Sequence, residues 1–284
     1  MEQITIPTQD GHDLPATLFE NNSGAQGSGP VILISSATAV PRKIYRRFAQ
    51  YLADNGARAV LTYDYRGMTD FTSGPHRKRR RHLRMSDWAI HDLPAAVKVL
   101  TRRYPDHKLA GLGHSFGGQA LGLSGVSDRF VRYMTIAAGS GYLADTKDPT
   151  RLWLTMNLFG YPLAWALGYL PRWAGMGEDI PFGAFNQWRR WCNSPDYFMS
   201  DPALPQTSQF AEVTIPMVSV GFEDDPWATR INVEALMSWY ANADIKLKWF
   251  TPQEAGGPIG HFGFFKPEHA DILWPQIADW LVRA

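Results

Sequence analysis

The sequence predicts an α/β fold in which a mostly parallel central sheet is covered by helices on both faces. Short apolar runs alternate with longer amphipathic segments along the 284 residues, and this alternation produces parallel strands joined by crossover helices. A second observation is the sequence Gly113-His-Ser-Phe-Gly117, which joins an apolar run to a helical pattern of small residues. The length fits one large domain, and a hydrophobic content of 45% supports a sizeable core.

The expected elements follow one another in a simple order. Strands are expected at 2–7, 12–20, 31–34, 58–64, 108–113, 130–137, 214–221 and 244–250. Helices are expected at 43–55, 86–104, 115–125, 228–240 and 267–283. A turn rich in Gly, Ser and Asn at 21–29 separates the second strand from the third. An irregular stretch interrupts the alternation, so we expect a core of residues 1–139 and 209–284 with an inserted helical cap at 140–208.

The motif Gly113-His-Ser-Phe-Gly117 matches G-x-S-x-G, the sharp turn that presents a nucleophilic serine between a strand and a helix. Such a turn holds the serine in a strained backbone conformation, and the two glycines avoid collisions that a Cβ atom would cause. The following helix directs free N–H groups and its positive dipole end at the reacting oxygen. We therefore predict Ser115 as a catalytic nucleophile.

A serine nucleophile needs a general base, and the base needs an acid that orients it. The apolar run that ends at Gly221 is followed by Glu223, Asp224 and Asp225, in the loop where this acid is expected. We predict Asp224, three residues past Gly221, with Asp225 as the second choice and Glu223 as the third. The remaining acids are expected in a solvated turn or in a helix cap.

The base is expected after the last strand of the sheet. His261 lies in a glycine-rich loop between the strand at 244–250 and the final helix. Among the eight histidines it is the one placed late in the chain, on a loop, among small residues that allow close approach. His114 lies within the elbow and cannot easily reach the Oγ of its own neighbour, and His269 lies in the final helical segment. We therefore predict His261 as the base.

Acyl transfer to a serine also needs hydrogen-bond donors for the oxyanion. One donor is expected from the residue after the nucleophile, Phe116, and the other from the loop after the strand at 31–34. This loop, residues 35–39, consists of small residues that let the backbone turn inward. We predict the N–H groups of Phe116 and Ala37 as the oxyanion hole, with Thr38 as the alternative to Ala37.

The segment 152–171 contains no charged residue and has an arginine on each side. Its length alone would suit a transmembrane helix. It lies, however, between two strands of one predicted sheet, and Gly160, Pro162 and Gly168 are expected to break it into short helices. We therefore expect no integral membrane segment and assign this stretch to the cap.

Aromatic side chains of the cap are expected to form an apolar substrate pocket. The predicted substrate-binding residues are Trp153, Phe159 and Trp165, and Trp173 is expected to contribute. The aromatic character continues at Trp188, Trp191 and Tyr197. The alternative is that these side chains hold the cap to the core, and both interpretations can apply to different residues.

Charge and cysteine content narrow the class of protein further. A net charge of +1 argues against a general acidic partner. The run Arg77–Arg84 holds six of the 28 Lys and Arg residues, and we interpret it as a solvated loop. An anionic group of the substrate, an anionic membrane surface and weak nucleic-acid contact are its alternatives. No nucleic-acid-binding module accompanies it, so no nucleic-acid partner is expected.

Cys192 is the single cysteine, which excludes an internal disulfide and a cysteine-ligated zinc ion. Residues 1–6 open as a strand and lack the features of a signal peptide. We therefore expect a cytoplasmic protein that needs no metal or cofactor and whose partner is a small-molecule acyl substrate. The sequence gives no signal for an oligomeric state.

Several motifs together resemble those of the α/β-hydrolase superfamily over nearly the whole chain. The chain is most similar to a bacterial group of predicted cytoplasmic α/β-hydrolases whose substrates are undefined. The motifs are Tyr63–Gly67, Gly113–Gly118, Trp191–Tyr197, Asp224–Thr229 and Gly260–Phe265. The elbow and the order serine, acid, histidine are typical of the superfamily, and the resemblance implies the α/β-hydrolase fold.

These residues predict a serine hydrolase that cleaves a carboxylic ester or thioester with an apolar acyl group. Ser115, His261 and Asp224 would act through an acyl-enzyme. An acyltransferase and an amidase or aminopeptidase stay open as alternatives, because the same triad serves all of them. A non-catalytic ligand-binding receptor is the alternative from another class, although a receptor does not need all three residues.

Overall fold

The computed structural model describes residues 1–21, 29–68 and 80–283. Its centre is an eight-stranded sheet in the order β1-β2-β4-β3-β5-β6-β9-β10. These strands are β1 (Glu2–Pro7), β2 (Asp13–Glu20), β3 (Val31–Ser35), β4 (Ala59–Tyr63), β5 (Leu109–His114), β6 (Arg132–Ile136), β9 (Met217–Phe222) and β10 (Ile245–Phe250). β2 pairs antiparallel with β1 and with β4, and all neighbours from β4 to β10 run parallel. The predicted mostly parallel sheet is confirmed.

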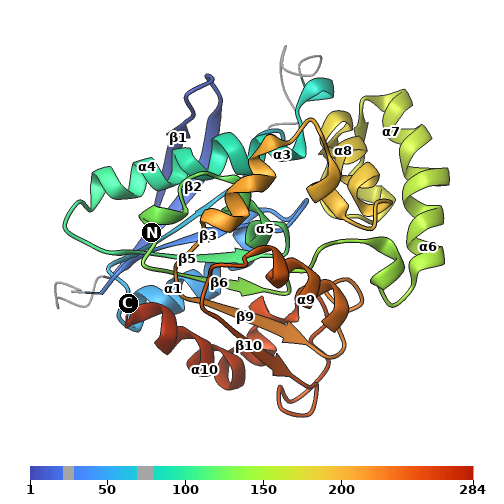
Figure 1. Cartoon of the computed structure of the whole chain (residues 1–284). Coiled ribbons are helices and arrows are strands. Elements are labelled where there is room, and N and C mark those ends of the chain that lie inside the picture. The colour runs from blue at the N-terminus through green and yellow to red at the C-terminus, as the bar shows by residue number, and fades with distance from the viewer. Residues whose placement is uncertain (22–28, 69–79, 284) are drawn as a thin grey trace.

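Helices cover both faces of the sheet (Figure 1). They are α1 (Arg46–Asp54), α3 (Met85–Asp87), α4 (Leu93–Arg103), α5 (Phe116–Leu123), α9 (Arg230–Trp239) and α10 (Ala270–Val282). α1 and α10 pack on one face, where the ring centroids of Phe48 and Trp274 lie 5.2 Å apart. α4 and α5 lie on the other face (Figure 1). Tyr240, directly after α9, donates to the carbonyl of Gly118 in α5 at 2.6 Å.

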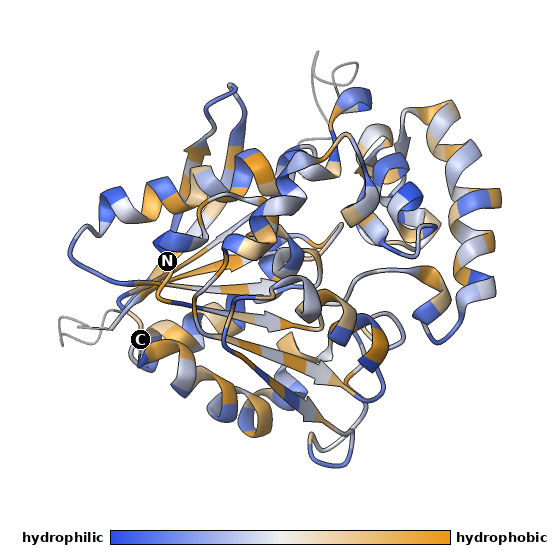
Figure 2. Ribbon diagram, viewed as in Figure 1, coloured by the Kyte–Doolittle hydropathy of each residue, from blue (hydrophilic) through white to orange (hydrophobic). Residues whose placement is uncertain are grey.

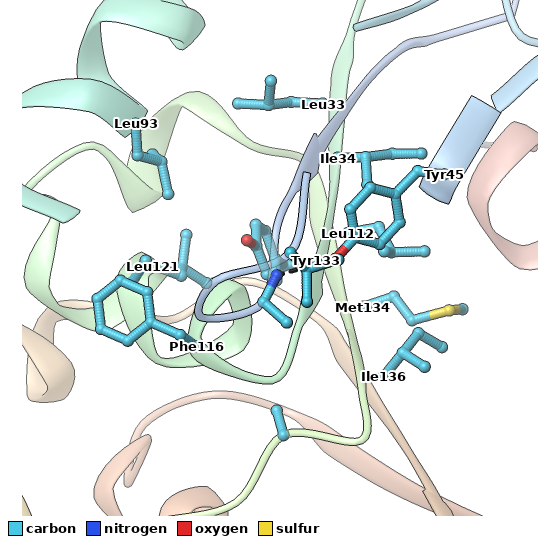
Figure 3. Close-up of a cluster of buried hydrophobic side chains, with 14 of the residues drawn as sticks. Leu33, Ile34, Tyr45, Leu93, Leu112, Phe116, Leu121, Tyr133, Met134 and Ile136 are labelled. Carbon is cyan, nitrogen blue, oxygen red and sulfur yellow. Dashed lines mark hydrogen bonds between the residues drawn. The ribbon is translucent and has the colours of Figure 1, made fainter. Parts of the chain in front are cut away.

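Burial of the central strands explains why they read as continuous apolar runs. β3, β4, β5 and β9 are buried along their whole length, since helices cover the sheet on both sides. Figure 3 shows part of this core, where Tyr45 and Tyr133 lie among aliphatic side chains of β3, β5 and β6. α4 and α10 carry both hydrophilic and hydrophobic residues along their length (Figure 2), as helices with one face in solvent do.

The insertion, residues 140–208, leaves the sheet after β6 and returns to β9 beside the carboxyl ends of the parallel strands (Figure 1). Its elements are α6 (Pro149–Leu154), a π-helical turn (Thr155–Gly160), α7 (Tyr161–Leu167), α8 (Phe182–Cys192) and the two-stranded pair of β7 (Tyr169–Leu170) and β8 (Ile180–Pro181). The division of the chain into a core and a cap at these boundaries stays a prediction.

The helices of the insertion differ from the expected short fragments. α6, the π-helical turn and α7 follow one another without a break and form one continuous helical segment, which we call the α6–α7 rod. Gly160 and Pro162 therefore do not interrupt it. Pro162 lies directly after the π-helical turn, at the start of α7. Gly168, with a φ of 83°, ends the helix as expected. None of the helices in the described ranges is both long enough and apolar enough to cross a membrane.

Candidate active site

Ser115 lies on the turn between β5 and α5 with φ 51° and ψ −114°, a conformation that costs free energy for a residue with a side chain. The two glycines of the motif make this turn possible. A Cβ atom on Gly113 would lie 2.2 Å from the carbonyl carbon of Gly117. A Cβ atom on Gly117 would lie 2.2 Å from the carbonyl oxygen of Ser35. The strained turn expected from the sequence is therefore present, and its serine is positioned as a nucleophile is in such an elbow.

His261 is held by Asp225. Its Nδ1 lies 2.8 Å from Asp225 Oδ2, and Asp225 Oδ1 accepts hydrogen bonds from the N–H groups of Trp227 at 2.8 Å and Ala228 at 3.0 Å. Burial alone raises the pKa of the Asp225 carboxyl, but His261 and the two N–H groups outweigh burial and the pKa is lowered. An ionised carboxylate at Nδ1 keeps the proton there and leaves Nε2 free to accept one.

Asp224 has a different partner, so the prediction that it orients the histidine is wrong. Its Oδ2 accepts the N–H of Ile259 at 2.8 Å, which ties this carboxylate to the loop just before His261. Glu223 is exposed and forms an ion pair with Arg230 at 2.6 Å. Successive side chains in a tight turn point in different directions. The turn therefore selects Asp225, the second choice from the sequence.

One cavity of about 660 Å³ brings the predicted residues together. Ser115, Phe116 and His261 all line it. Its apolar wall is formed mainly by Leu152, Phe159, Met176, Trp188, Trp227 and Phe262. This volume is typical of small-molecule sites. A second hollow of about 510 Å³, between β2 and the loop before α1, contains none of these side chains.

Only one of the predicted substrate-binding residues lines this cavity. Phe159 does so. Trp153 and Trp165 are 44% and 59% exposed and lie outside the cavity wall, so their assignment to the pocket is wrong. Trp173 is also exposed, with its ring centroid 6.4 Å from that of Phe159. The segment is a surface rod, and composition alone does not say which side of a helix faces inward.

The loop after β3 gives a further correction. The N–H of Ala37 donates to Tyr45 Oη at 2.9 Å, so this donor is already occupied and Ala37 is wrong as an oxyanion donor. Thr38 lines the cavity beside Ser115, and its N–H has no hydrogen-bond partner among the described residues. Phe116 begins α5, and the first N–H groups of a helix lack intrahelical acceptors. Thr38, the alternative from the sequence, and Phe116 are therefore the available donors.

His114, the residue before the nucleophile, connects this loop to the histidine loop. Its Nδ1 lies 2.9 Å from Tyr45 Oη, and its Nε2 lies 2.9 Å from the carbonyl oxygen of His261. Burial, together with the nearby His261, lowers the pKa of His114 to about 3, so the ring is neutral at neutral pH. Both ring nitrogens of His114 therefore have partners, a structural role that the sequence did not reveal.

Trp227 and Phe262 line the cavity and were missed by sequence reasoning, whereas Trp188 and Tyr197, named there among the cap aromatics, also line it. Trp227 follows Asp225 by two positions and Phe262 follows His261 directly, so closeness to the triad residues was the available signal. Trp188 of α8 stacks on Trp227 with ring centroids 5.8 Å apart, and this pair joins the insertion to the loop that carries Asp225. Within the part of the chain that the structure describes, no group of three or more His, Cys, Asp or Glu side chains could hold a metal ion.

Comparisons with known proteins identify the family and the fold. A model of the alpha/beta hydrolase family matches residues 31–270, which include Ser115, Asp225 and His261. An esterase from Pyrococcus furiosus superposes with a TM-score of 0.61 at 15% identity, covering 99% of this chain and 91% of that chain. Brefeldin A esterase, a bacterial homologue of human hormone-sensitive lipase, gives a TM-score of 0.64 at 15% identity, with coverages of 99% and 76%.

Est1E from Butyrivibrio proteoclasticus, solved with bound ferulic acid, gives a TM-score of 0.60 at 15% identity, with coverages of 98% and 97%. No curated protein sequence matches. At this identity the solved structures establish the fold, whereas the family model covers most of the chain. The chain therefore belongs to the alpha/beta hydrolase family.

Proposed function

We propose that the protein is a serine hydrolase of carboxylic esters or thioesters with an apolar acyl group. One observation carries the proposal: Ser115, on its strained turn, lines the same cavity as His261, whose Nδ1 is held by the buried carboxylate of Asp225. A nucleophile, a base and an orienting acid are the groups that acyl transfer requires. The esterases among the similar structures support this reading of the fold.

In the first half of the proposed reaction, Ser115 Oγ attacks the acyl carbon while His261 Nε2 takes the hydroxyl proton. The carbonyl oxygen becomes an oxyanion, and the N–H groups of Phe116 and Thr38 are positioned to donate to it. Loss of one such donor typically costs about 3 kcal/mol of transition-state stabilisation. The tetrahedral intermediate then expels the alcohol or thiol, which receives the proton from His261, and the acyl group remains on Ser115.

In the second half, water attacks the acyl-enzyme and His261 accepts its proton. Collapse of this second intermediate releases the carboxylic acid, and the proton returns to Ser115 Oγ. Asp225 stays ionised throughout, fixes the tautomer of His261 and stabilises the imidazolium that forms twice in the cycle. The carboxylate is already preorganised for this role by its two backbone donors.

The proposed apolar acyl specificity follows from the cavity wall. The insertion contributes Leu152, Phe159, Met176 and Trp188 to the same cavity as Ser115. We infer that the insertion acts as a cap, because its side chains form the wall opposite the elbow. Apolar groups gain about 0.8 kcal/mol for each methylene transferred from water to such a site.

Labelling with a fluorophosphonate probe tests the nucleophile directly. We expect covalent modification of Ser115, located by peptide mass spectrometry, and no labelling of the Ser115→Ala variant. Turnover of a p-nitrophenyl ester should fall by roughly six orders of magnitude in that variant, with an unchanged circular dichroism spectrum. Labelling at another residue, or retention of more than a few per cent of the activity in protein free of contaminating esterase, would rule out the assignment.

A further inference from the structure

The outer side of the α6–α7 rod is apolar. Every exposed residue from Leu152 to Leu167 is an apolar one, namely Trp153, Leu154, Leu158, Phe159, Pro162, Trp165, Ala166 and Leu167. A helix on the surface of a protein normally presents polar side chains to water and apolar ones to the core. The rod lies along the outer edge of the insertion (Figure 1), so this exposure is not explained by packing against the rest of the chain.

The exposed side chains form one surface. Leu154, Leu158 and Trp165 are 45%, 63% and 59% exposed, and their spacings of four and seven residues place them on one side of the rod. Trp173 is 66% exposed and lies beside Phe159, which extends the surface past the end of α7. We call the side chains of Trp153, Leu154, Leu158, Phe159, Trp165, Leu167 and Trp173 the apolar face.

Positive charge surrounds the apolar face. Residues 149–177 contain no Asp or Glu, while Arg151 and Arg172 are exposed at its two ends. Arg81, from the predicted basic run, donates to the carbonyl of Trp165 at 2.6 Å; residues 77–79 of that run lie outside the described residues. Among the described side chains, none of these three guanidinium groups has a carboxylate within ion-pair distance.

The nearest acidic residues in the sequence are Asp148, Glu178 and Asp179. Glu178 lines the second hollow together with Arg172, and the other two have backbone partners. Asp148 caps α6 by accepting the N–H of Arg151 at 3.2 Å, and Asp179 accepts the N–H of Arg172 at 2.8 Å. These contacts involve backbone groups and leave the guanidinium groups available. An exposed apolar surface of this kind, rich in Trp and Leu and bordered by arginines, has the composition of segments that lie in the interface of an anionic membrane.

The apolar face continues into the cavity. Phe159 belongs to both, since it is 48% exposed and also lines the cavity with Ser115. Leu152, one position before the first residue of the face, lines the cavity as well. The apolar face and the cavity that contains Ser115 are therefore joined at Phe159.

A second copy of the chain fits this surface less well. A symmetric dimer places the same patch on both subunits against itself. Such a dimer would bring Arg151 and Arg172 of each copy close to those of the other, and residues 149–177 themselves contain no carboxylate. The flanking Asp148 and Asp179 already accept backbone N–H groups of their own chain. Anionic headgroups supply the missing negative charge, and the acyl region below them accommodates the Trp and Leu side chains.

We propose that the apolar face binds an anionic lipid surface, with the rod lying along it. Delivery of acyl substrates from that surface into the cavity rests on the proposed esterase function, whereas binding to the surface does not. This proposal gives the insertion a second role besides forming the cavity wall. It also gives a function to the exposed tryptophans that the cavity does not use.

Sedimentation with sucrose-loaded vesicles tests the proposal on the full-length Ser115→Ala protein, so that binding is measured without turnover. We expect binding to vesicles of phosphatidylcholine and phosphatidylglycerol and weaker binding to phosphatidylcholine alone, with affinity falling as salt rises. Leu158→Gln together with Trp165→Gln should lower the partition coefficient by at least about tenfold, since each side chain forfeits its apolar burial. Arg172→Gln should lower it roughly fivefold for the anionic vesicles only.

The matched control is Ile231→Gln together with Leu247→Gln, two apolar side chains that are 62% and 45% exposed on the core. This pair should leave the partition coefficient unchanged. Hydrolysis of a soluble short-chain ester in the absence of lipid should be unchanged in the Leu158/Trp165 variant on the active background.

Three results would overturn the proposal: equal binding to both vesicle types, equal binding by the Leu158/Trp165 variant and its parent, or a wild-type dimer in sedimentation velocity that this variant converts to monomer. The last result would assign the apolar face to a second copy. If the protein binds vesicles but a fluorophosphonate does not label Ser115, the proposed esterase function is wrong, and the assignment of the apolar face as a lipid-binding surface is unaffected.

Discussion

Tyr45 and His114 share a hydrogen bond of 2.9 Å whose direction is fixed by the groups on either side. The carbonyl of His261 can only accept, so His114 Nε2 carries a proton and donates to it at 2.9 Å. Because the ring is neutral, Nδ1 must accept the Tyr45 hydroxyl proton. The lone pairs of Tyr45 Oη in turn accept the N–H of Ala37.

This chain of bonds joins three loops of the site. Ala37 precedes Thr38, His114 precedes Ser115, and the last acceptor is the backbone of His261. Tyr45 and His114 touch no reacting atom, so we regard them as positioning residues. Their hydrogen bonds connect the loops that carry the proposed oxyanion donor Thr38 and the proposed base His261 to the turn at Ser115. A displacement of about 1 Å in such groups can lower a rate by about 100-fold.

The first prediction concerns Tyr45→Phe. This change leaves the Ala37 N–H and His114 Nδ1 buried without partners, and each unsatisfied group costs about 1–3 kcal/mol of stability. We also expect kcat for ester hydrolysis to fall more than KM rises, because the loops shift and substrate contacts remain. Urea denaturation and steady-state kinetics measure the two effects.

Tyr51→Phe is the matched control for that variant. Tyr51 lies in α1, the helix that begins directly after Tyr45, and no hydrogen bond of its hydroxyl occurs among the described residues. It should be close to neutral in both measurements. Equal effects of the two substitutions would show that the Tyr45 hydroxyl has no special role.

The second prediction is that His114 makes stability decrease in acid. Its pKa is about 3 in the folded protein against an ordinary value of 6.5, so the unfolded chain binds the proton first. This stabilisation is complete above about pH 6.5, and the free energy of unfolding falls by roughly 1.4 kcal/mol per pH unit below it, until about pH 3. The His114→Gln variant lacks this group and therefore lacks its share of the decrease.

The measurement is the difference in unfolding free energy between wild type and His114→Gln as a function of pH. As the pH falls from roughly 7 to 5, the unfolding free energy of wild type should decrease by about 2 kcal/mol more than that of His114→Gln. This change is expected whatever the difference between the two proteins is near neutral pH. The other titrating groups are common to both proteins and cancel in this difference. A difference that stays constant over the range contradicts the buried neutral histidine.

The third prediction separates the two neighbouring acids. Asp225→Asn removes the negative charge that fixes the tautomer of His261, and kcat should fall by about 10³–10⁴. Asp224→Asn retains an oxygen that can accept the N–H of Ile259. We therefore expect kcat to change less than tenfold. Steady-state kinetics of both variants decide the matter, and a larger effect at Asp224 would reverse the assignment that the structure supports.

The fourth prediction is a preference for medium-length acyl groups over acetyl. The apolar wall of the cavity should gain about 0.8 kcal/mol, or close to fourfold, for each methylene until the space is filled. Only part of this gain needs to emerge in kcat/KM, because ground-state binding also improves. Values of kcat/KM for p-nitrophenyl esters from acetate to decanoate provide the measurement.

A monotonic decrease from acetate would show that the usable part of the cavity is small or polar. Trp188→Ala is a useful companion, because the ring of Trp188 lines the cavity and stacks on Trp227. Loss of this ring should enlarge the cavity and shift the preferred acyl chain to a greater length. The fluorophosphonate probe should still label Ser115. An unchanged profile would place the acyl group elsewhere in the cavity.

The sequence by itself determined the parallel sheet and the tight turn at Ser115, and it predicted His261 as the base. Strand and helix periodicities are local properties of the chain, and the tight turn at Ser115 needs glycines at fixed positions, so both leave a readable pattern. His261 could be predicted because it lies in the loop that follows the last predicted strand and precedes the final helix. For the same reason the acid was confined to residues 223–225.

The tertiary structure decided the choices that depend on side-chain direction. Asp225 rather than Asp224 faces His261, because Asp224 accepts the N–H of Ile259. The N–H of Ala37 donates to Tyr45, whereas that of Thr38 has no partner among the described residues. Ile259 and Tyr45 are distant in sequence from the residues that they bind. The orientation of the α6–α7 rod is decided in the same way. A segment that is apolar on all sides carries no periodicity to show which side packs inward, so only the folded chain places Phe159 in the cavity and leaves Trp165 in solvent.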